Sequence, residues 1–390
     1  MSLKIGFVER HAKGESISAL CREFGVSRPT GHKWVKRFRE LGYAGLDDES
    51  RRPKTAPLST AEEIVMAVLE ARDAHPRWGP QTLEHLLRRK FGDKTPSEST
   101  IARILRRANK VQSRRRKSPT SVVERPPHVE ALAPNDVWTV DFKGWWRALN
   151  GERCEPLTVR DAYSRYVLAT DICSSKTVDV RKTFERLFRR HGVPRAIQSD
   201  NGVPFVCVTA RGGLSMLSAW WVSLGIRIVR SRPACPQDNG GHERMHADMS
   251  ADVEKTPAET PREQQRIIDR WRQEFNHVRP HHALAGKTPA EIYKPTERLP
   301  AIVRKPRYPP LLRIALVGKV GCIKLGGETY FVSGSLRGLL VGIESLDAMR
   351  LRIWFYGMDL GVLEVVPNIR DEFFDNRIER KKKKHRRQAA

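Results

Sequence analysis

VWTVDFKG (137–144) is a short run of β-branched and aromatic residues that carries one aspartate. Such residues favour strands, so we expect Asp141 within or at the end of an apolar strand. A second run, AIQSDNG (196–202), places Asp200 where a strand enters an Asn-Gly turn. Two acids are therefore expected at the ends of two strands.

The chain around these runs alternates between strand and helix patterns. Residues 176–192 have the apolar spacing of an amphipathic helix, which Gly192 closes. This alternation predicts an open α/β domain with a mixed sheet over residues 134–293.

A third acid, Glu243, lies in CPQDNGGHERMH (235–246) and opens an expected helix after a Gly-bearing turn. Strand ends of an open α/β sheet converge on one crevice, so Glu243 on a facing helix would complete an oxygen-lined site with Asp141 and Asp200. Such a site suits Mg²⁺ or Mn²⁺ rather than zinc. Two ions there would clamp the attacking and leaving oxygens of a phosphoryl transfer. A single strand-end aspartate is more often a turn former, so the prediction depends on all three acids.

The composition points to a polyanionic partner. The chain has 390 residues, with 71 Lys and Arg against 45 Asp and Glu, a formal net charge of +26. Nucleic acid and an anionic membrane surface are the two candidates. No apolar run is long enough to span a bilayer, and the first residues lack the apolar segment of a secretory signal. The six cysteines include no CxxC pair, so we expect a reducing, intracellular compartment.

Residues 1–50 have the pattern of a helix-turn-helix: a short apolar helix, a break at Gly25, and a second helix that Ser27 caps. The basic face of the second helix is predicted to contact DNA, although a helical hairpin with a solvated basic face would look the same. The residues of this face are Arg28, His32, Lys33, Lys36 and Arg37.

Residues 58–112 read as a second helix-turn-helix, whose last helix has a basic end. A basic linker, 113–133, follows it. The predicted DNA contacts of this region are Arg103, Arg106, Arg107, Arg114, Arg115 and Arg116.

The end of the chain changes to an all-β pattern. A proline-bearing linker, 294–310, leads into short strands over 311–367 that are separated by glycine-rich turns. This pattern predicts a small β-barrel. A basic tail, 368–390, completes the chain and would attract phosphate groups non-specifically.

Several of these segments together resemble the bacterial insertion-sequence transposases, whose DDE catalytic core is shared with retroviral integrases. The segments are VWTVDFKGWW (137–146), PLTVRDAYSRYVLA (156–169), QSDNGVPF (198–205), RPACPQDNGGHERMH (232–246) and FNHVRPHHALAGKTPAEIY (275–293). The resemblance implies an RNase H-like core in which Asp141, Asp200 and Glu243 are the catalytic, metal-binding acids. It implies a reaction in which water exposes a 3′-OH at the element's end, and that 3′-OH then attacks target DNA.

The resemblance also implies partners. They are double-stranded DNA, as terminal inverted repeats and as target, and further copies of the chain in a dimer or tetramer assembled on DNA. Two Mg²⁺ ions are the expected cofactors, and Mn²⁺ is expected to substitute. The expected location is the bacterial cytoplasm, at the nucleoid, with no membrane association.

The sequence departs from the family pattern in three ways. More residues separate Asp200 from Glu243 than is common in the family, and residues 207–216 look like an inserted loop. Ala247 and Ser250 stand on the helix after Glu243, where the family often has basic residues. The zinc-binding N-terminal domain of viral integrases is absent from the sequence pattern.

Other residues near the acids are weaker candidates. Asn201 and His246 are candidates for supporting the metal site or contacting phosphate, as is Arg244. His242 is a further candidate for contacting phosphate or water near the metals. Asp161 and Arg165 in DAYSRY are interpreted as part of a capped or salt-linked strand turn instead of the site.

Two other functions remain open from the sequence. A DNA-binding regulator derived from a transposase would keep the helix-turn-helix units and lose catalytic acids, whereas all three are present. An RNase H-like nuclease without strand transfer would not need two N-terminal DNA-binding units and a C-terminal β domain.

Overall fold

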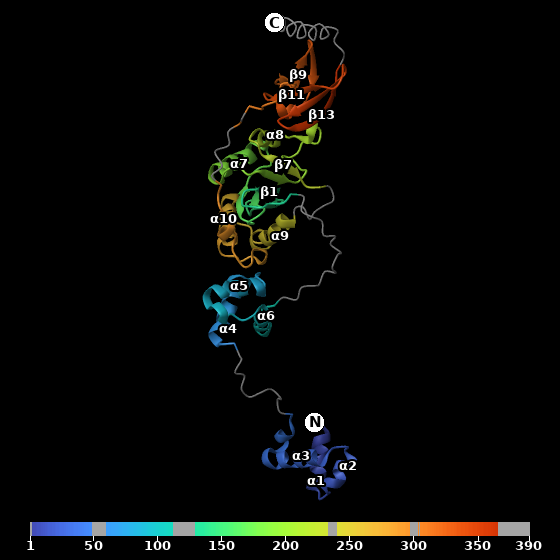
Figure 1. Cartoon of the computed structure of the whole chain (residues 1–390). Helices are drawn as coiled ribbons and strands as arrows, with labels where there is room; N and C mark the ends of the chain where they lie inside the picture. The colour runs from blue at the N-terminus through green and yellow to red at the C-terminus, as the bar shows by residue number, and fades with distance from the viewer. Residues whose placement is uncertain are drawn as a thin grey trace. The chain divides into compact units, whose positions relative to one another are not determined.

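The computed structural model describes residues 2–48, 60–111, 129–232, 240–296, 303 and 305–365. The chain divides into two compact units, Met1–Glu62 and Glu63–Ala390 (Figure 1). Within the described residues, no helix is long and apolar enough to cross a membrane.

The first unit is a three-helix bundle with a short 3-10 turn. Its helices are α1 (Ser2–Ala12), α2 (Ile17–Glu23) and α3 (Arg28–Leu41), followed by Gly42–Leu46. The hydroxyl of Ser27 accepts a hydrogen bond from the amide of Thr30 and caps α3 as predicted. Phe7, Leu20 and Val35 are buried between the helices. The predicted helix-turn-helix is therefore present.

The second unit begins with another helical group. Its helices are α4 (Glu62–Ala74), α5 (Pro80–Phe91) and α6 (Glu98–Arg107). Leu83, Ile101 and Leu105 are fully buried between them.

A five-stranded mixed sheet follows, in the order β5-β4-β1-β6-β7. Strand β1 pairs antiparallel with β4 and parallel with β6, β4 pairs antiparallel with β5, and β6 pairs parallel with β7. A small hairpin of β2 (Trp146–Arg147) and β3 (Arg153–Cys154) lies between β1 and β4 in the chain. The strands of the sheet are β1 (Val137–Phe142), β4 (Pro156–Asp161), β5 (Val167–Ile172), β6 (Ala196–Ser199) and β7 (Arg227–Arg230).

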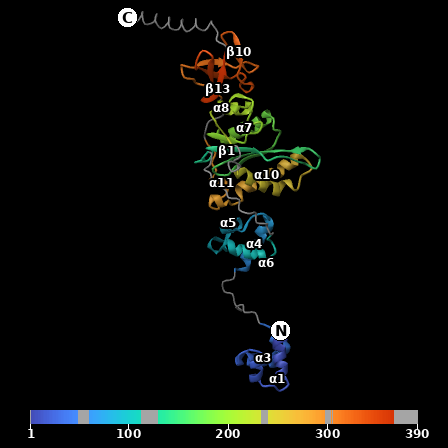
Figure 2. The same ribbon diagram turned by 90° about the vertical axis from the view of Figure 1, so that its right-hand side faces the viewer.

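Helices cover both faces of this sheet (Figures 1 and 2). On one face, α7 (Thr177–His191) and α8 (Met216–Ser223) pack against the apolar side chains of β1, β4 and β6. On the other face lie α9 (Gly240–Met249), its π-helical extension Ser250–Glu254, and α10 (Pro261–His277). A short α11 (Pro289–Ile292) follows. The predicted α/β core with a mixed sheet is confirmed.

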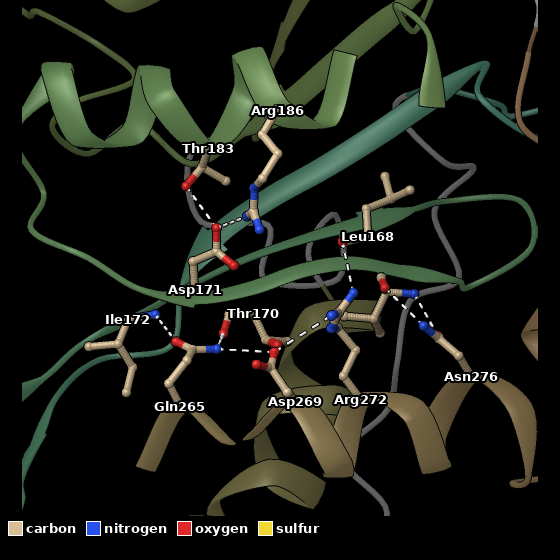
Figure 3. A network of polar contacts seen from close by, with 11 residues as sticks. Leu168, Thr170, Asp171, Ile172, Thr183, Arg186, Gln265, Asp269, Arg272 and Asn276 are labelled. Carbon is tan, nitrogen blue, oxygen red and sulfur yellow. Dashed lines mark hydrogen bonds and ion pairs between the residues drawn. The ribbon is translucent and has the colours of Figure 1, made fainter. Parts of the chain in front are cut away.

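The edge strand β5 is closed by polar side chains of α10 (Figure 3). The Asn276 amide accepts from Val167 N at 2.8 Å and donates to Val167 O at 2.9 Å. Gln265 makes the matching pair of bonds to Ile172 N and Thr170 O, at 2.7 and 2.9 Å. Unpaired backbone groups on an edge strand invite other chains to add to the sheet. These amides therefore complete the edge, which gives the Asn276 of the FNHVRPH segment a structural role.

Replacing Asn276 by leucine should lower the free energy of unfolding by about 2–4 kcal/mol, because it leaves two buried backbone groups without partners. Gln273 is exposed on the same helix, so Gln273→Leu is the matched control and should change little. Urea unfolding of both variants measures the difference. Equal losses in the two variants would show that the edge bonds contribute nothing.

A polar cluster joins α7, α11 and the start of the sheet. The Tyr293 hydroxyl bonds to Asn135 Oδ1 at 2.9 Å and lies 3.1 Å from His191 Nδ1. The Trp138 indole donates to the same Asn135 oxygen at 2.8 Å. His191 is buried, and this burial, followed by the charge of Arg190, lowers its pKa to about 4.

This histidine should make stability depend on pH. The unfolded imidazole binds a proton near pH 6.5, so its contribution is complete above that pH and is lost as the pH falls toward 4. We expect His191 to lower the free energy of unfolding by about 1.4 kcal/mol per pH unit in that window. Denaturant unfolding at several pH values should give a flatter profile for His191→Gln, whereas His282→Gln, at an exposed position, should follow the wild type.

The C-terminal strands do not form the predicted barrel. Residues 305–365 form a four-stranded sheet, β13-β12-β11-β8, and a separate pair, β10-β9. Among the described strands β9 pairs only with β10, so the β9–β10 hairpin is not part of the four-stranded ladder. The two open sheets share one apolar core instead. Their strands are β8 (Arg313–Leu316), β9 (Cys322–Leu325), β10 (Glu328–Phe331), β11 (Leu340–Ser345), β12 (Arg350–Phe355) and β13 (Met358–Glu364).

The expected loop at 207–216 is present and packs against this C-terminal domain. It contains one short 3-10 turn, Arg211–Gly213. The Arg211 guanidinium donates to Val362 O at 2.7 Å. A Cβ on Gly212, whose φ is +61°, would lie 2.6 Å from Leu360. The loop thus packs against β13. The fold accommodates the additional residues between Asp200 and Glu243 in this way.

Candidate active site

Asp141 and Asp200 lie at the same end of two neighbouring strands. Strands β1 and β6 are parallel, with Val140 opposite Ser199. The next residue in each case is the acid, and both acids are partly exposed. The predicted meeting of the two strand ends is therefore seen in the register of the sheet.

The turn after β6 holds Asp200 in place. Its Oδ1 accepts from Gly202 N at 3.1 Å. A Cβ on Gly202 would lie 3.0 Å from the other carboxylate oxygen, so a side chain there would press on the acid. Asn201, a predicted supporting residue, donates from Nδ2 to Ser231 O at 3.0 Å. This bond ties the turn to the end of β7.

Helix α9 lies across the polar face of β1 and β4 and carries Glu243. His242, Met245 and Met249 on this helix are buried, whereas Glu243 and Arg244 are exposed. Asp248 pairs with Arg279 at 2.8 Å. Since residues four apart share a helix face, Arg244 lies on the side of α9 that faces Arg279.

A single threonine hydroxyl joins α9 to the strand of Asp141. Thr158 Oγ1 donates to the backbone oxygen of Asp141 at 2.9 Å. It lies 3.2 Å from His242 Nδ1 and 2.8 Å from His246 Nε2. The single hydroxyl proton of Thr158 is donated to the Asp141 oxygen. His242 Nδ1 and His246 Nε2 therefore act as donors to Thr158 Oγ1. His242 Nε2 lies 2.7 Å from Thr139 Oγ1.

Both histidines are neutral at physiological pH. Burial, followed by the charges of Arg160 and His246, holds the pKa of His242 well below its ordinary range. Burial, followed by Lys143 and Arg160, lowers the pKa of His246 to about 4. His242 is 1% exposed, so it fixes α9 to the sheet and is not the phosphate or water contact that the sequence suggested.

Within the described residues, Asp141, His242 and His246 bring ligand atoms within 4.8 Å of one another. Asp200 and Glu243 are not part of this group. The two histidines are four residues apart, so they share one helix face. This spacing is the local signal in the sequence that they lie close together. Thr139 and Thr158, which hold them, gave no such signal.

The interpretation of DAYSRY as a strand turn is partly confirmed. Asp161 is fully buried and accepts from Asn135 N and Ser164 N, each at 2.7 Å, and from the Ser164 hydroxyl at 2.5 Å. It is a capped turn, and no ion pair between Asp161 and Arg165 occurs in the described part of the chain.

The predicted DNA contacts lie mostly on exposed helix faces. Arg37 is half-buried. The three consecutive arginines at 114–116 lie outside the described residues. The exposed candidates are Arg28, His32, Lys33 and Lys36 on α3, and Arg103, Arg106 and Arg107 on α6.

Comparison with known families identifies the modules. Residues 131–236 and 224–289 each match an integrase core domain. The centre of the chain is thus similar to integrase core domains. Residues 3–54 match a helix-turn-helix domain, and residues 30–105 match a homeodomain-like domain.

The chain is also similar to proteins of insertion elements. The uncharacterized 39.2 kDa protein of insertion element IS476 of Xanthomonas euvesicatoria is 28% identical over 284 residues, 72% of this chain and 79% of the relative. The uncharacterized 31.7 kDa protein of IS407 of Burkholderia multivorans is 28% identical over 263 residues, 66% of this chain and 90% of the relative.

Solved structures similar to this chain include retroviral integrases. The catalytic core domain of HTLV-2 integrase in complex with magnesium has a TM-score of 0.33 and 17% identity, and covers 42% of this chain and 100% of its own. The simian T-cell lymphotropic virus intasome in complex with a PP2A regulatory subunit has a TM-score of 0.36 and 15% identity, and covers 77% and 99%.

The donor groups of this integrase core fit a hard divalent cation. Asp141 and Asp200 offer carboxylate oxygens at adjacent strand ends, and Glu243 offers another from the exposed side of α9. Both ring nitrogens of His242 are used by threonine hydroxyls, so this histidine offers no free ligand atom. Oxygen ligands are those that Mg²⁺ and Mn²⁺ prefer.

Proposed function

We propose that this protein is a DNA transposase that binds the terminal inverted repeats of an insertion sequence, cleaves a DNA strand and transfers the 3′-OH into target DNA. The observation that carries the proposal is the placement of Asp141 and Asp200 side by side at the ends of β1 and β6. The helix-turn-helix domains and the relatives in insertion elements support it.

In this proposal Asp141, Asp200 and Glu243 hold two Mg²⁺ ions, for which Mn²⁺ substitutes. When bound, such ions neutralise charge on the attacking and leaving oxygens of an in-line phosphoryl transfer. The protein itself positions the three acids. The Gly202 amide orients Asp200, and His242 fixes the helix that carries Glu243.

The basic residues have the complementary role of holding DNA. The exposed arginines and lysines of α3 and α6 bind phosphates and bases of the element's ends. Two ends must meet one target, so we infer that the active form is a dimer or tetramer assembled on double-stranded DNA.

A joining assay tests the proposal. A labelled duplex of one element end is mixed with the full chain and a plasmid in Mg²⁺, and in Ca²⁺ as a control. Labelled end joined to plasmid in Mg²⁺ alone is the expected result. Nicking without joining would favour an RNase H-like nuclease, and binding without cutting would favour a DNA-binding regulator.

A further inference from the structure

Arg160 is a buried cation of the central sheet. It lies on β4, opposite Thr139 of β1, and is 9% exposed. Its Nε is buried and has no hydrogen-bond partner. Neighbouring cations are paired, Lys143 with Glu254 and Arg279 with Asp248. Arg160 forms no ion pair within the residues that the structure describes.

The adjacent acid, Asp161, attracts Arg160 electrostatically and raises its pKa, but it forms no ion pair with Arg160 in the described part of the chain. Its two oxygens are taken by the amides of Asn135 and Ser164 and by the Ser164 hydroxyl. A buried charge without a partner costs several kcal/mol, so the position of Arg160 calls for an anion from outside this part of the chain.

The Arg160 guanidinium lies against the first turn of α9. A Cβ on Gly241 would be 2.3 Å from Nη1 and 2.6 Å from Nη2. A side chain at position 241 would therefore displace the guanidinium from the backbone there. The N-terminal amides of a ten-residue helix carry partial positive charge, so two positive groups face each other at this point.

Further cations surround the same place. Arg165 is half-buried in the left-handed conformation, with a φ of +63°, and has no ion pair in the described part of the chain. Burial, followed by Arg165, lowers the pKa of Arg160 to about 10. Burial, followed by Arg244, lowers the pKa of Arg165. His281 nearby is neutral, since burial, followed by Arg279 and Arg165, lowers its pKa to about 3.

We propose that Arg160, Arg165 and the first turn of α9 bind one phosphodiester group of DNA. A phosphate offers several oxygens to a guanidinium fork and to helix N-terminal amides at once. Thr158 of β4 pairs with Asp141 of β1. Arg160 is two residues farther along β4, roughly 6.6 Å, so a phosphate bound to Arg160 would lie close to Asp141. This inference rests on the proposed DNA-processing function.

The first test uses inorganic phosphate and the full chain. Melting temperatures are measured in chloride and in phosphate at matched pH and ionic strength. Phosphate should raise the melting temperature of the wild type by roughly 2–4 °C. Arg160→Met, which removes an unpaired buried charge, should melt at least as high as the wild type in chloride and should gain nothing from phosphate. Arg190→Met, at an exposed position on α7, is the control and should respond as the wild type does.

The second test measures DNA binding in Ca²⁺ at several salt concentrations. Loss of one phosphate contact should lower the slope of log Kobs against log salt by about 0.9 in Arg160→Met, and by nothing in Arg190→Met. Arg160→Lys keeps the positive charge but loses the two-pronged guanidinium donor group. It should give an intermediate response in both tests, and it replaces Arg160→Met if that variant does not fold.

The two tests separate the inference from the proposed function. A response of Arg160→Met to phosphate equal to that of the wild type would overturn the site. A phosphate response with an unchanged DNA slope would overturn the assignment to DNA and leave a site for free phosphate. If the wild type binds no DNA, the proposed function fails, and the phosphate test alone decides the site.

Discussion

Asp200→Asn should abolish strand cleavage and joining and leave DNA binding intact. We expect the rate to fall by about 10³-fold, because metal-assisted charge stabilisation contributes several kcal/mol and each 1.4 kcal/mol is about tenfold in rate. The amide keeps the size of the carboxylate and its Oδ1 can still accept from Gly202 N. The turn should therefore survive, and only the negative charge is removed.

Both activities are measured on the same preparation. Cleavage of a labelled end duplex in Mg²⁺ reports catalysis, and binding of the same duplex in Ca²⁺ reports affinity. Glu185→Gln is a matched control, because Glu185 is an acid on α7, on the opposite face of the sheet, in a surface pair with Arg181 at 2.9 Å. Such pairs contribute little, so the control should retain both activities.

Two results would count against the assignment. Full cleavage by Asp200→Asn would remove this acid from the site. Loss of DNA binding in the same variant would contradict the separation between acids that act on the scissile strand and basic residues that hold the duplex.

The sequence predicted the parts of the site that depend on local pattern. The strands that carry Asp141 and Asp200 have dense β-branched and aromatic runs, and the Asn-Gly turn marks the end of the second strand. Parallel neighbours then end at one edge of the sheet, as the general geometry of α/β folds requires. The helix-turn-helix units were predictable for the same reason, since caps and apolar spacing are local signals.

The parts that depend on distant contacts were not predictable. Nothing near Thr158 in the sequence shows that it meets His242, 84 residues away. Nothing in the sequence marks Arg160 as buried, because arginines are seldom buried without a partner. The barrel was not predictable for a related reason. The strand lengths and turns fit a barrel, but closure requires pairing between distant strands, and among the described strands β9 and β10 pair only with each other.

The last prediction concerns the contact between α9 and the sheet. His242→Ala should lower the free energy of unfolding by about 2–5 kcal/mol, since it removes a buried side chain and leaves Thr139 and Thr158 short of partners. It should also slow cleavage and raise the Mg²⁺ concentration needed for half-maximal rate. Both effects follow because Glu243 is the next residue and depends on the position of this helix.

Conservative variants separate positioning from bulk stability. His242→Asn can offer a donor near the place of Nδ1, toward Thr158, whereas His242→Gln reaches nearer the place of Nε2, toward Thr139. Because Thr158 is the hydroxyl that also holds the backbone of Asp141, the asparagine variant should recover more cleavage than the glutamine variant at saturating Mg²⁺. His277→Ala, at an exposed position on α10, is the control for stability. If both variants lose cleavage only in proportion to their loss of stability, His242 is a packing residue and does not position Glu243.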